Sequence, residues 1–345
     1  MGTAALSRAL IATDFGPLEV AADWVSWILL VAALVMFAAA LVALTWSLRN
    51  SEDRLRDRIV APVFGPLYAA IPGSVFTLIL ALQAHAPHLA ADPVARALVL
   101  SVVAATLATG LWLTVTFFVA AFEDEDFEAH SISGTWFLPE TVVLLSVLVL
   151  FVLTDESQGS LRTTLAAITV AVTGIGFVLF VLTAALFFSR LVLVRQHHEP
   201  GVAAIWIMMS PLSVSSLALG KAAAVLPALV DVPQGTIIAL VSLGSGLLWG
   251  FGLWWLMAAL VLTRHQGRRS LSFTPGSWAY VFPLSAISLA SADLARIWGS
   301  ALVAVVGIAL VAFTFVVWSI VAVTGVRWVR TGRRAAIASS TGTVV

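Results

Sequence analysis

Residues 132–153 read ISGTWFLPETVVLLSVLVLFVL, and Glu140 is the only charged side chain among them. A helix rises 1.5 Å per residue, so about 20 apolar residues cross the ~30 Å hydrocarbon core of a membrane. The stretch therefore predicts a transmembrane helix. It also contains Pro139, which interrupts helical hydrogen bonding, and this combination recurs elsewhere in the chain.

The overall composition is that of a membrane protein. Hydrophobic residues make up 61% of the 345 residues and charged residues only 10%, whereas soluble domains carry about 25% charged residues. The chain has no cysteine, which excludes disulfides, thiol catalysis and cysteine-ligated metal. Its formal net charge is zero and it has no long basic cluster, so we expect no nucleic-acid partner.

Nine apolar stretches are long enough to span a membrane: 24–48, 60–82, 95–121, 132–153, 165–193, 202–225, 236–263, 278–297 and 300–326. Residues 1–12 form a tenth apolar element, too short to cross alone and without the basic region of a signal peptide. We interpret it as the end of a first helix that is truncated at its N-terminus. We expect one transmembrane domain, residues 1–330, and a short cytoplasmic tail, residues 331–345.

The placement of arginine predicts the orientation. If the span 24–48 ends in the cytoplasm, the cytoplasmic segments hold Arg49, Arg54, Arg56, Arg58, Arg190, Arg195, Arg264, Arg268, Arg269, Arg327, Arg330, Arg333 and Arg334. The other side and the spans hold Arg8, Arg96, Arg162, Lys221 and Arg296. This matches the positive-inside rule, to which the acidic turn 123–128 contributes little. We predict a multi-pass protein of a bacterial inner membrane with its C-terminus in the cytoplasm.

Prolines recur at a regular spacing within the apolar spans. Pro72, Pro139, Pro211 and Pro283 are separated by 67, 72 and 72 residues, and each lies in an odd-numbered helix of a ten-helix count. Proline kinks a helix, and inside a membrane the freed carbonyls need a protein or water partner. We therefore predict an all-α fold with an inner ring of kinked odd-numbered helices and an outer ring of even-numbered ones. The alternative is that proline is simply common in membrane helices.

Three short motifs resemble one known family. The stretch SWAYVFPL, residues 277–284, resembles the Trp-x-Tyr/Phe-x-Phe-Pro signature in the ninth helix of the tellurite-resistance/dicarboxylate transporter family. That family includes plant guard-cell slow anion channels and fungal malate and sulfite transporters. The stretch GTWFLP, residues 134–139, resembles its fifth-helix Trp-Phe-x-Pro, and MGT, residues 1–3, resembles a motif of its first helix. With ten helices, the resemblance covers essentially the whole chain.

The resemblance implies both a fold and a function. The fold consists of five helical hairpins, with the odd-numbered helices around a central pore, in a homotrimer whose subunits each have a pore. The function is transport of small anions of the chloride, nitrate, sulfite and C4-dicarboxylate class. A ninth-helix phenylalanine blocks the pore in the family, and the matching residue is Phe282. The chain departs from the family at Glu140, where a proline or a small residue is usual.

Phe282 has two interpretations. It lies about eight residues into its predicted helix, roughly 12 Å from the cytoplasmic end. At that depth an apolar side chain can gate a pore by excluding water. The other interpretation is a packing phenylalanine, one of nineteen in the chain.

Glu140 is predicted near the middle of the membrane, facing the helix ring rather than lipid. A charge at that depth costs at least ~3 kcal/mol and commonly marks a function, so we expect burial to favour the neutral form. Three interpretations remain open. The carboxyl donates a hydrogen bond to a carbonyl freed by the proline, or carries protons in a coupled transporter, or repels anions and tunes selectivity.

Three cationic residues, Lys221, Arg296 and Arg162, are predicted near the outer mouth, where they attract anions. Helix rise places Lys221 some 13 Å from Glu140 along the membrane normal, so we expect no pair between them. The alternative for each cation is a snorkelling side chain at the membrane interface.

Enzymatic chemistry has little support in the sequence. All six histidines, at positions 85, 88, 130, 197, 198 and 265, fall in or beside predicted loops. Ser245 lies between two glycines in a span, but no membrane histidine is available to activate it. We expect no catalysis, no cofactor and no metal. Besides passive anion transport, a proton-coupled exporter that uses Glu140 and a non-transporting scaffold or sensor remain as alternatives.

Overall fold

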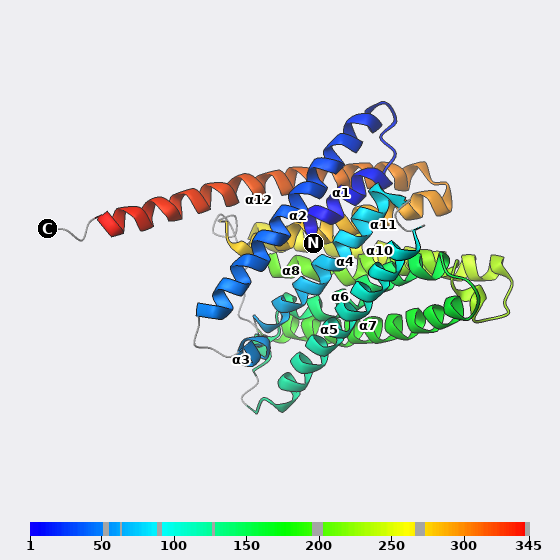
Figure 1. The fold of residues 1–345 in the computed structure, drawn as a ribbon, viewed down its shortest axis with the longest axis horizontal. Helices are drawn as coiled ribbons and strands as arrows, with labels where there is room; N and C mark the ends of the chain where they lie inside the picture. Colours follow the sequence, from blue (N-terminus) through cyan, green and yellow to red (C-terminus); the bar gives the residue numbers. More distant parts are fainter. Residues whose placement is uncertain are drawn as a thin grey trace.

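The computed structural model describes residues 1–50, 55–62, 64–87, 92–125, 128–194, 203–265 and 273–341. Within these residues every regular element is a helix. Nine of the described helical segments are long and apolar enough to cross a membrane, which confirms the nine predicted spans. The helices pack side by side into one bundle (Figure 1), so the chain has an all-α integral membrane fold.

Five helices form a closed inner ring. They are α1 (Gly2–Ala12), α4 (Ala70–His85), α6 (Phe137–Asp155), α9 (Met209–Ala222) and α11 (Val281–Trp298). Each packs against the next in this order, and α11 packs against α1. In the most apolar part of the α6 segment 94% of the residues are buried, because other helices surround α6 on all sides.

Five longer helices cover this ring. They are α2 (Glu19–Asn50), α5 (Pro93–Glu123), α7 (Gly159–Leu193), α10 (Gln234–His265) and α12 (Ala301–Thr341). Each outer helix packs against the inner helix that precedes it in the sequence and against the one that follows it. The last outer helix, α12, packs against α11 and α1 and so closes the outer ring. Only 17% of the most apolar part of the α2 segment is buried, so apolar side chains face outward. The predicted division into inner odd and outer even helices is confirmed.

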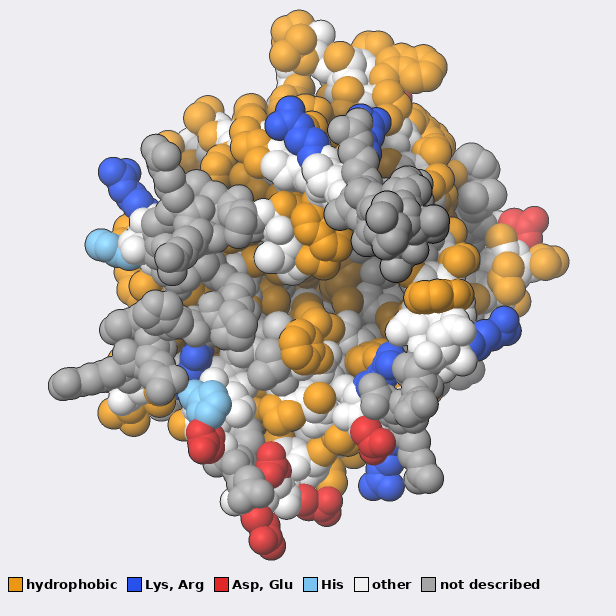
Figure 2. Space-filling view, turned by 90° about the vertical axis from the view of Figure 1, so that its left-hand side faces the viewer, with side chains coloured by type: hydrophobic (Ala, Val, Ile, Leu, Met, Phe, Trp, Pro, Cys, Tyr) orange, Lys and Arg blue, Asp and Glu red, His pale blue; other side chains and the backbone are white. Residues whose placement is uncertain are grey.

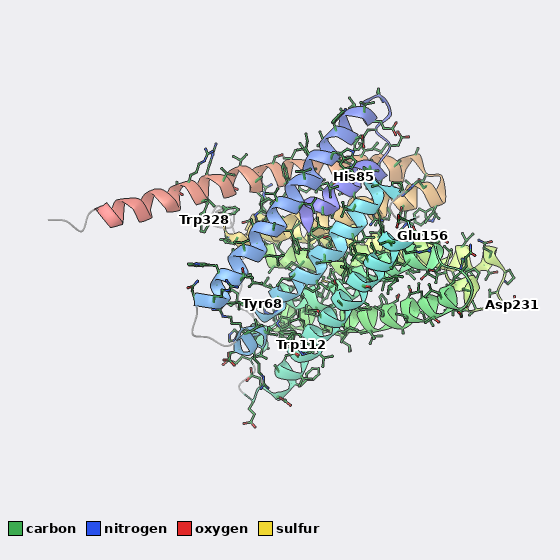
Figure 3. All side chains as sticks on the ribbon, in the orientation of Figure 1. Tyr68, His85, Trp112, Glu156, Asp231 and Trp328 are labelled. Atoms are coloured by element: carbon green, nitrogen blue, oxygen red, sulfur yellow. The ribbon has the colours of Figure 1, made fainter. Side chains whose placement is uncertain are left out.

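The two ends of the bundle differ in their connections. At the hairpin end, each inner helix joins its own outer helix through residues 13–18, 86–92, 156–158, 223–233 and 299–300. At the crossover end, each outer helix leads to the next inner helix, and α12 projects beyond the bundle (Figure 1). Asp231 lies at the hairpin end and Trp328 toward the crossover end (Figure 3). Figure 2 looks onto the crossover end and shows charged side chains around a largely apolar centre.

Arginines gather at the crossover end, as the sequence predicts. Arg49, Arg190 and Arg264 lie in the last turns of α2, α7 and α10, and Arg56 and Arg58 lie in the short helix α3 (Leu55–Ile59). Some predicted residues lie outside the described residues or have side chains that do: Arg54, Arg195, Arg268, Arg269, Arg333, Arg334, His88, His197 and His198. Helix α12 continues to Thr341, so the predicted tail begins as an extension of this helix.

The four evenly spaced prolines share one local structure. Each is the third residue of its α-helix, in α4, α6, α9 and α11. A 3₁₀ segment precedes α4, α6 and α11, and the short helix α8 (Ala203–Ile207) precedes α9. The first N–H groups of a helix have no intrahelical acceptor, so proline removes no hydrogen bond there. The predicted kinks are therefore junctions at which α-helices begin inside the spans, rather than bends within continuous α-helices.

Gly134 and Trp136 fix one of these junctions. A side chain at Gly134 would collide with the backbone carbonyl of Ala204 in α8. The indole nitrogen of Trp136 donates a hydrogen bond to the carbonyl of Pro62 at 3.0 Å. The GTWFLP stretch thus needs glycine for a close approach of two backbones and tryptophan to hold the loop before α4.

Tryptophans of the outer ring donate hydrogen bonds to the inner ring. The indole nitrogen of Trp318 in α12 lies 3.1 Å from the hydroxyl of Thr3. The indole nitrogen of Trp249 in α10 lies 2.8 Å from the hydroxyl of Ser291. Water is absent from the hydrocarbon core, so polar groups there need protein partners. These bonds hold the outer helices in one orientation around the ring.

Candidate functional site

The centre of the inner ring holds a narrow cavity. Its volume is about 20 Å³, which is room for about one water molecule. All five inner helices contribute to its lining: Ala5, Arg8, Thr77, Leu80, Leu145, Leu148, Val214, Leu217, Phe282, Ala286 and Leu289. Among these residues only Arg8 and Thr77 are polar, so the wall is mainly apolar.

Phe282 forms part of this wall, and its side chain is 6% exposed. It is the second residue of α11 and follows the 3₁₀ segment Pro275–Tyr280. It is also the eighth residue of the segment Pro275–Trp298, counted from the crossover end. Its aromatic ring is one of the bulky apolar side chains that keep this cavity narrow.

Helix α1 closes the ring directly beside Phe282. A Cβ atom on Gly2 would lie 2.9 Å from the Cβ of Val281 and 3.0 Å from the backbone nitrogen of Phe282. The hydroxyl of Ser285 also donates to the carbonyl of Gly2, at 3.4 Å. Glycine permits this close approach because it has no side chain. The short helix can therefore present Ala5 and Arg8 to the cavity.

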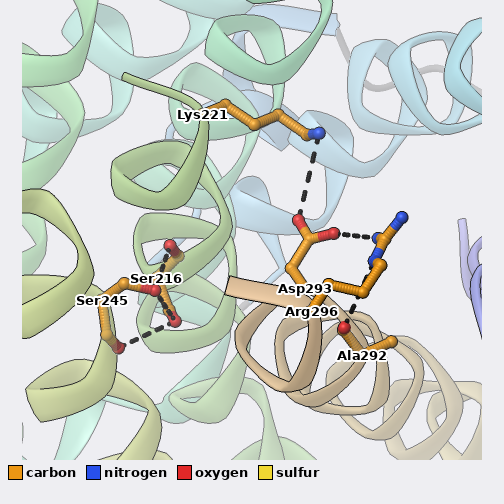
Figure 4. A network of polar contacts seen from close by, with 6 residues as sticks. All are labelled: Ser216, Lys221, Ser245, Ala292, Asp293 and Arg296. Carbon is orange, nitrogen blue, oxygen red and sulfur yellow. Dashed lines mark hydrogen bonds and ion pairs between the residues drawn. The ribbon is translucent and has the colours of Figure 1, made fainter. Parts of the chain in front are cut away.

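Charged residues meet at the hairpin end of the cavity, and Figure 4 shows Asp293 in contact with Lys221 and Arg296. The Oδ2 atom of Asp293 lies 3.9 Å from the Nζ of Lys221, and its Oδ1 atom accepts a hydrogen bond from Arg296. Arg8, in the cavity wall, interacts electrostatically with both Asp293 and Arg296. We call Arg8, Lys221, Asp293 and Arg296 the cationic cluster, because three cations interact with one carboxylate.

The cationic cluster continues the wall of the cavity. Lys221 follows Leu217 by one turn of α9, and Asp293 follows Leu289 by one turn of α11. Residues four apart lie on the same face of a helix. Because both leucines line the cavity, the charged side chains extend the same surface toward the hairpin end.

The cationic cluster contains two of the three residues that were predicted at the outer mouth, together with two further residues. Lys221 and Arg296 meet through Asp293. Arg162 lies at the same end, where its guanidinium donates to the carbonyl of Ala224 at 3.1 Å. Neither Arg8 nor Asp293 was predicted as a site residue from the sequence. A signal for both was present, because each is an ionisable residue inside an apolar segment, a position that commonly marks function.

Glu140 lies between the two rings. Its side chain is fully buried, and neither carboxylate oxygen has a hydrogen-bond partner among the described residues. The residue stands in the first turn of α6, and its carboxyl faces Thr183 of the outer helix α7. The α6 side chains that line the cavity are instead Leu145 and Leu148. Glu140 is shielded from lipid, as predicted, but it points toward α7 and not into the ring.

The helices form two concentric rings around a narrow cavity, with a cationic cluster at one end. This arrangement is that of a multi-pass membrane protein of the channel and transporter class. The sequence profile of the voltage-dependent anion channel family matches residues 1–326. The chain belongs to this family, which confirms the resemblance found in its motifs.

Two similar proteins come from the archaeon Methanocaldococcus jannaschii, and both are named uncharacterized transporters. MJ0576 is 24% identical over 223 residues, which cover 64% of this chain and 61% of the relative. MJ0762 is 25% identical over 224 residues, which cover 64% of this chain and 62% of the relative. The matched region thus spans less than two thirds of the length of either relative.

Proposed function

We propose that the chain conducts small anions across the membrane through its inner ring. The observation that carries this proposal is the cavity, where all five inner helices meet and which continues into the cationic cluster. Positive charge along such a path attracts anions and offsets part of the cost of leaving water. Membership of the voltage-dependent anion channel family supports the same function.

In this proposal Phe282 is the gate of the pathway. The surrounding cavity of about 20 Å³ has room for about one water molecule, which is too little for a hydrated anion. Rotation or displacement of the Phe282 ring would widen the passage, because the neighbouring wall residue Ala286 is small. The evenly spaced prolines, including Pro283, belong to the same pathway because each lies in the first turn of an inner-ring helix.

We propose chloride, nitrate, sulfite and C4-dicarboxylates as the substrate class. Guanidinium and ammonium groups bind both carboxylates and small inorganic anions through charge-assisted hydrogen bonds, so the cationic cluster fits every member of this class. The test is chloride efflux from proteoliposomes that contain the purified protein, with nitrate, sulfite and malate as competitors over a range of pH. Flux equal to that of empty liposomes for every anion would support the alternative of a scaffold or sensor.

A second candidate function is proton-coupled export, and Glu140 favours it. A buried carboxyl group without a hydrogen-bond partner among the described residues is costly, and such groups in membrane spans commonly carry protons. Coupling would require proton exchange at Glu140 to alter the packing of α6 against α7. Dependence of the flux on an imposed pH gradient distinguishes this function from passive conduction.

For the assembly we propose a homotrimer in a bacterial inner membrane, with the crossover end and the C-terminus in the cytoplasm. The arginines at the crossover end support this orientation, and the family resemblance supports the trimer. Native mass spectrometry of the detergent-solubilised protein tests the subunit number.

A further inference from the structure

The carboxylate of Asp293 lies among the cations that, in the proposed pathway, would attract an incoming anion. Both of its oxygens face cations, Oδ2 toward Lys221 and Oδ1 toward Arg296. Arg8 adds a third positive charge from the cavity side. A carboxylate in an anion pathway repels the anion that approaches it, so its presence in this cluster needs an explanation beyond simple attraction.

The ion pairs in the cluster leave hydrogen-bond donors free. The Lys221–Asp293 distance of 3.9 Å is well beyond the 2.7–2.9 Å of a charge-assisted hydrogen bond. Neither Lys221 nor Arg8 makes a side-chain hydrogen bond within the part of the chain that the structure describes. These two cations can therefore accept another anion without first breaking hydrogen bonds.

The cluster is also accessible. The side chain of Arg296 is 64% exposed, that of Lys221 33% and that of Asp293 17%. One further acid, Asp155, interacts electrostatically with Lys221, but it lies 4.0 Å from Arg162, with which it forms its own ion pair. Within the cationic cluster the formal charge is therefore +2, from three cations and one carboxylate.

We propose that Asp293 is a tethered competitor: its carboxylate occupies an anion-binding site formed by Arg8, Lys221 and Arg296, and a small permeating anion must replace it. This inference rests on the proposed function. A group attached to the site by a short tether has an effective concentration in the millimolar range or above. The tethered carboxylate thus weakens the binding of free anions and speeds their release, so that ions pass through the site instead of remaining in it.

The test compares two neutralising substitutions at the same end of the bundle. Asp293→Asn removes the carboxylate with almost no change in shape. Asp231→Asn removes the same charge from an exposed position at the hairpin end, outside the cluster (Figure 3). Chloride efflux from proteoliposomes gives the half-saturating concentration. Thermal unfolding of the solubilised protein, with sodium chloride replaced stepwise by sodium gluconate, gives chloride binding without any need for flux.

We expect Asp293→Asn to lower the half-saturating chloride concentration about tenfold and to increase stabilisation by chloride, while Asp231→Asn changes neither. Lys221→Gln should have the opposite effect and weaken chloride binding. Unchanged chloride binding in Asp293→Asn, or the same change in Asp231→Asn, would overturn the inference. Absence of flux in all variants, together with stronger chloride binding in Asp293→Asn, would support the anion site and contradict the proposed transport function instead.

Discussion

Phe282 and Asp293 lie on one face of α11, three helical turns apart, or about 16 Å at 1.5 Å per residue. Ala286 and Leu289, between them on that face, line the cavity. A single helix therefore carries an apolar part of the cavity wall toward the crossover end and a charged residue of the cationic cluster toward the hairpin end. Substitutions at the two positions should alter different properties, the rate of permeation at Phe282 and the affinity for anions at Asp293.

Phe282→Ala should raise the anion flux. The substitution removes the aromatic ring from the wall of a cavity of about 20 Å³, which lowers the barrier to a hydrated ion. We expect an increase of about tenfold, equivalent to ~1.4 kcal/mol in the barrier. Chloride efflux from proteoliposomes at matched protein content measures this change.

Phe180→Ala is the control for that experiment. Phe180 is buried in the outer helix α7, where it packs against Phe137 and does not line the cavity. Its removal should destabilise the protein by about 3 kcal/mol without an increase in flux. Equal flux increases in both variants would mean that loosened packing, and not a gate at Phe282, controls permeation.

The inner and outer helices could be predicted from the sequence because the membrane constrains the length and hydrophobicity of each span separately. Spans must be apolar and about 20 residues long, and the regular prolines marked every second span as an inner helix. The described segments agree with the predicted spans to within about five or six residues at most boundaries. Two boundaries differ more. The first described segment begins at Gly16 rather than at residue 24. The last helix, predicted to end at residue 326, continues to Thr341, because a polar segment can extend a helix beyond the bilayer.

The cationic cluster could not be assembled from sequence alone. Arg8, Lys221 and Asp293 come from three helices, and their meeting depends on how α1, α9 and α11 rotate about their axes. The direction of Glu140 was misjudged for the same reason. A proline beside a residue indicates interrupted hydrogen bonding, but it does not determine whether the side chain faces the ring or the outer helix. Packing of α6 against α7 decides this orientation.

Glu140→Gln separates the two candidate functions. If Glu140 exchanges protons during each transport cycle, flux in the parent protein should vary with pH, and this variation should vanish in Glu140→Gln. The glutamine keeps the shape of the side chain and cannot change its charge. Chloride or malate efflux between pH 5 and pH 8 provides the measurement. Glu128→Gln, at an exposed position of the crossover end, should retain the pH dependence of the parent. Flux of the parent that does not vary with pH would eliminate proton coupling through Glu140.

Gly134→Ala should destabilise the fold. The added methyl group would meet the carbonyl of Ala204, and backbone atoms on both sides cannot move away easily. Overpacking of this kind costs about 1–3 kcal/mol, visible as a lower melting temperature in detergent. Gly174→Ala in α7 is the matched control, because no neighbouring atom lies within 4 Å of the added Cβ. Its melting temperature should stay equal or rise slightly, since alanine favours helix more than glycine does. Similar losses in both variants would show that the GTWFLP stretch does not depend on the close approach at Gly134.

The orientation in the membrane can be tested by labelling single cysteines, because the natural chain contains none. Asp231→Cys places a thiol at the hairpin end and Glu125→Cys places one at the crossover end, both at exposed positions. With the crossover end in the cytoplasm, a membrane-impermeant maleimide should label Asp231→Cys in spheroplasts. Glu125→Cys should react only after the membrane is permeabilised. Each variant serves as the control for the other, because both thiols must react fully in detergent. The reverse pattern would place the arginine-rich end outside, against the positive-inside rule, and would assign the cationic cluster to the cytoplasmic mouth of the pathway.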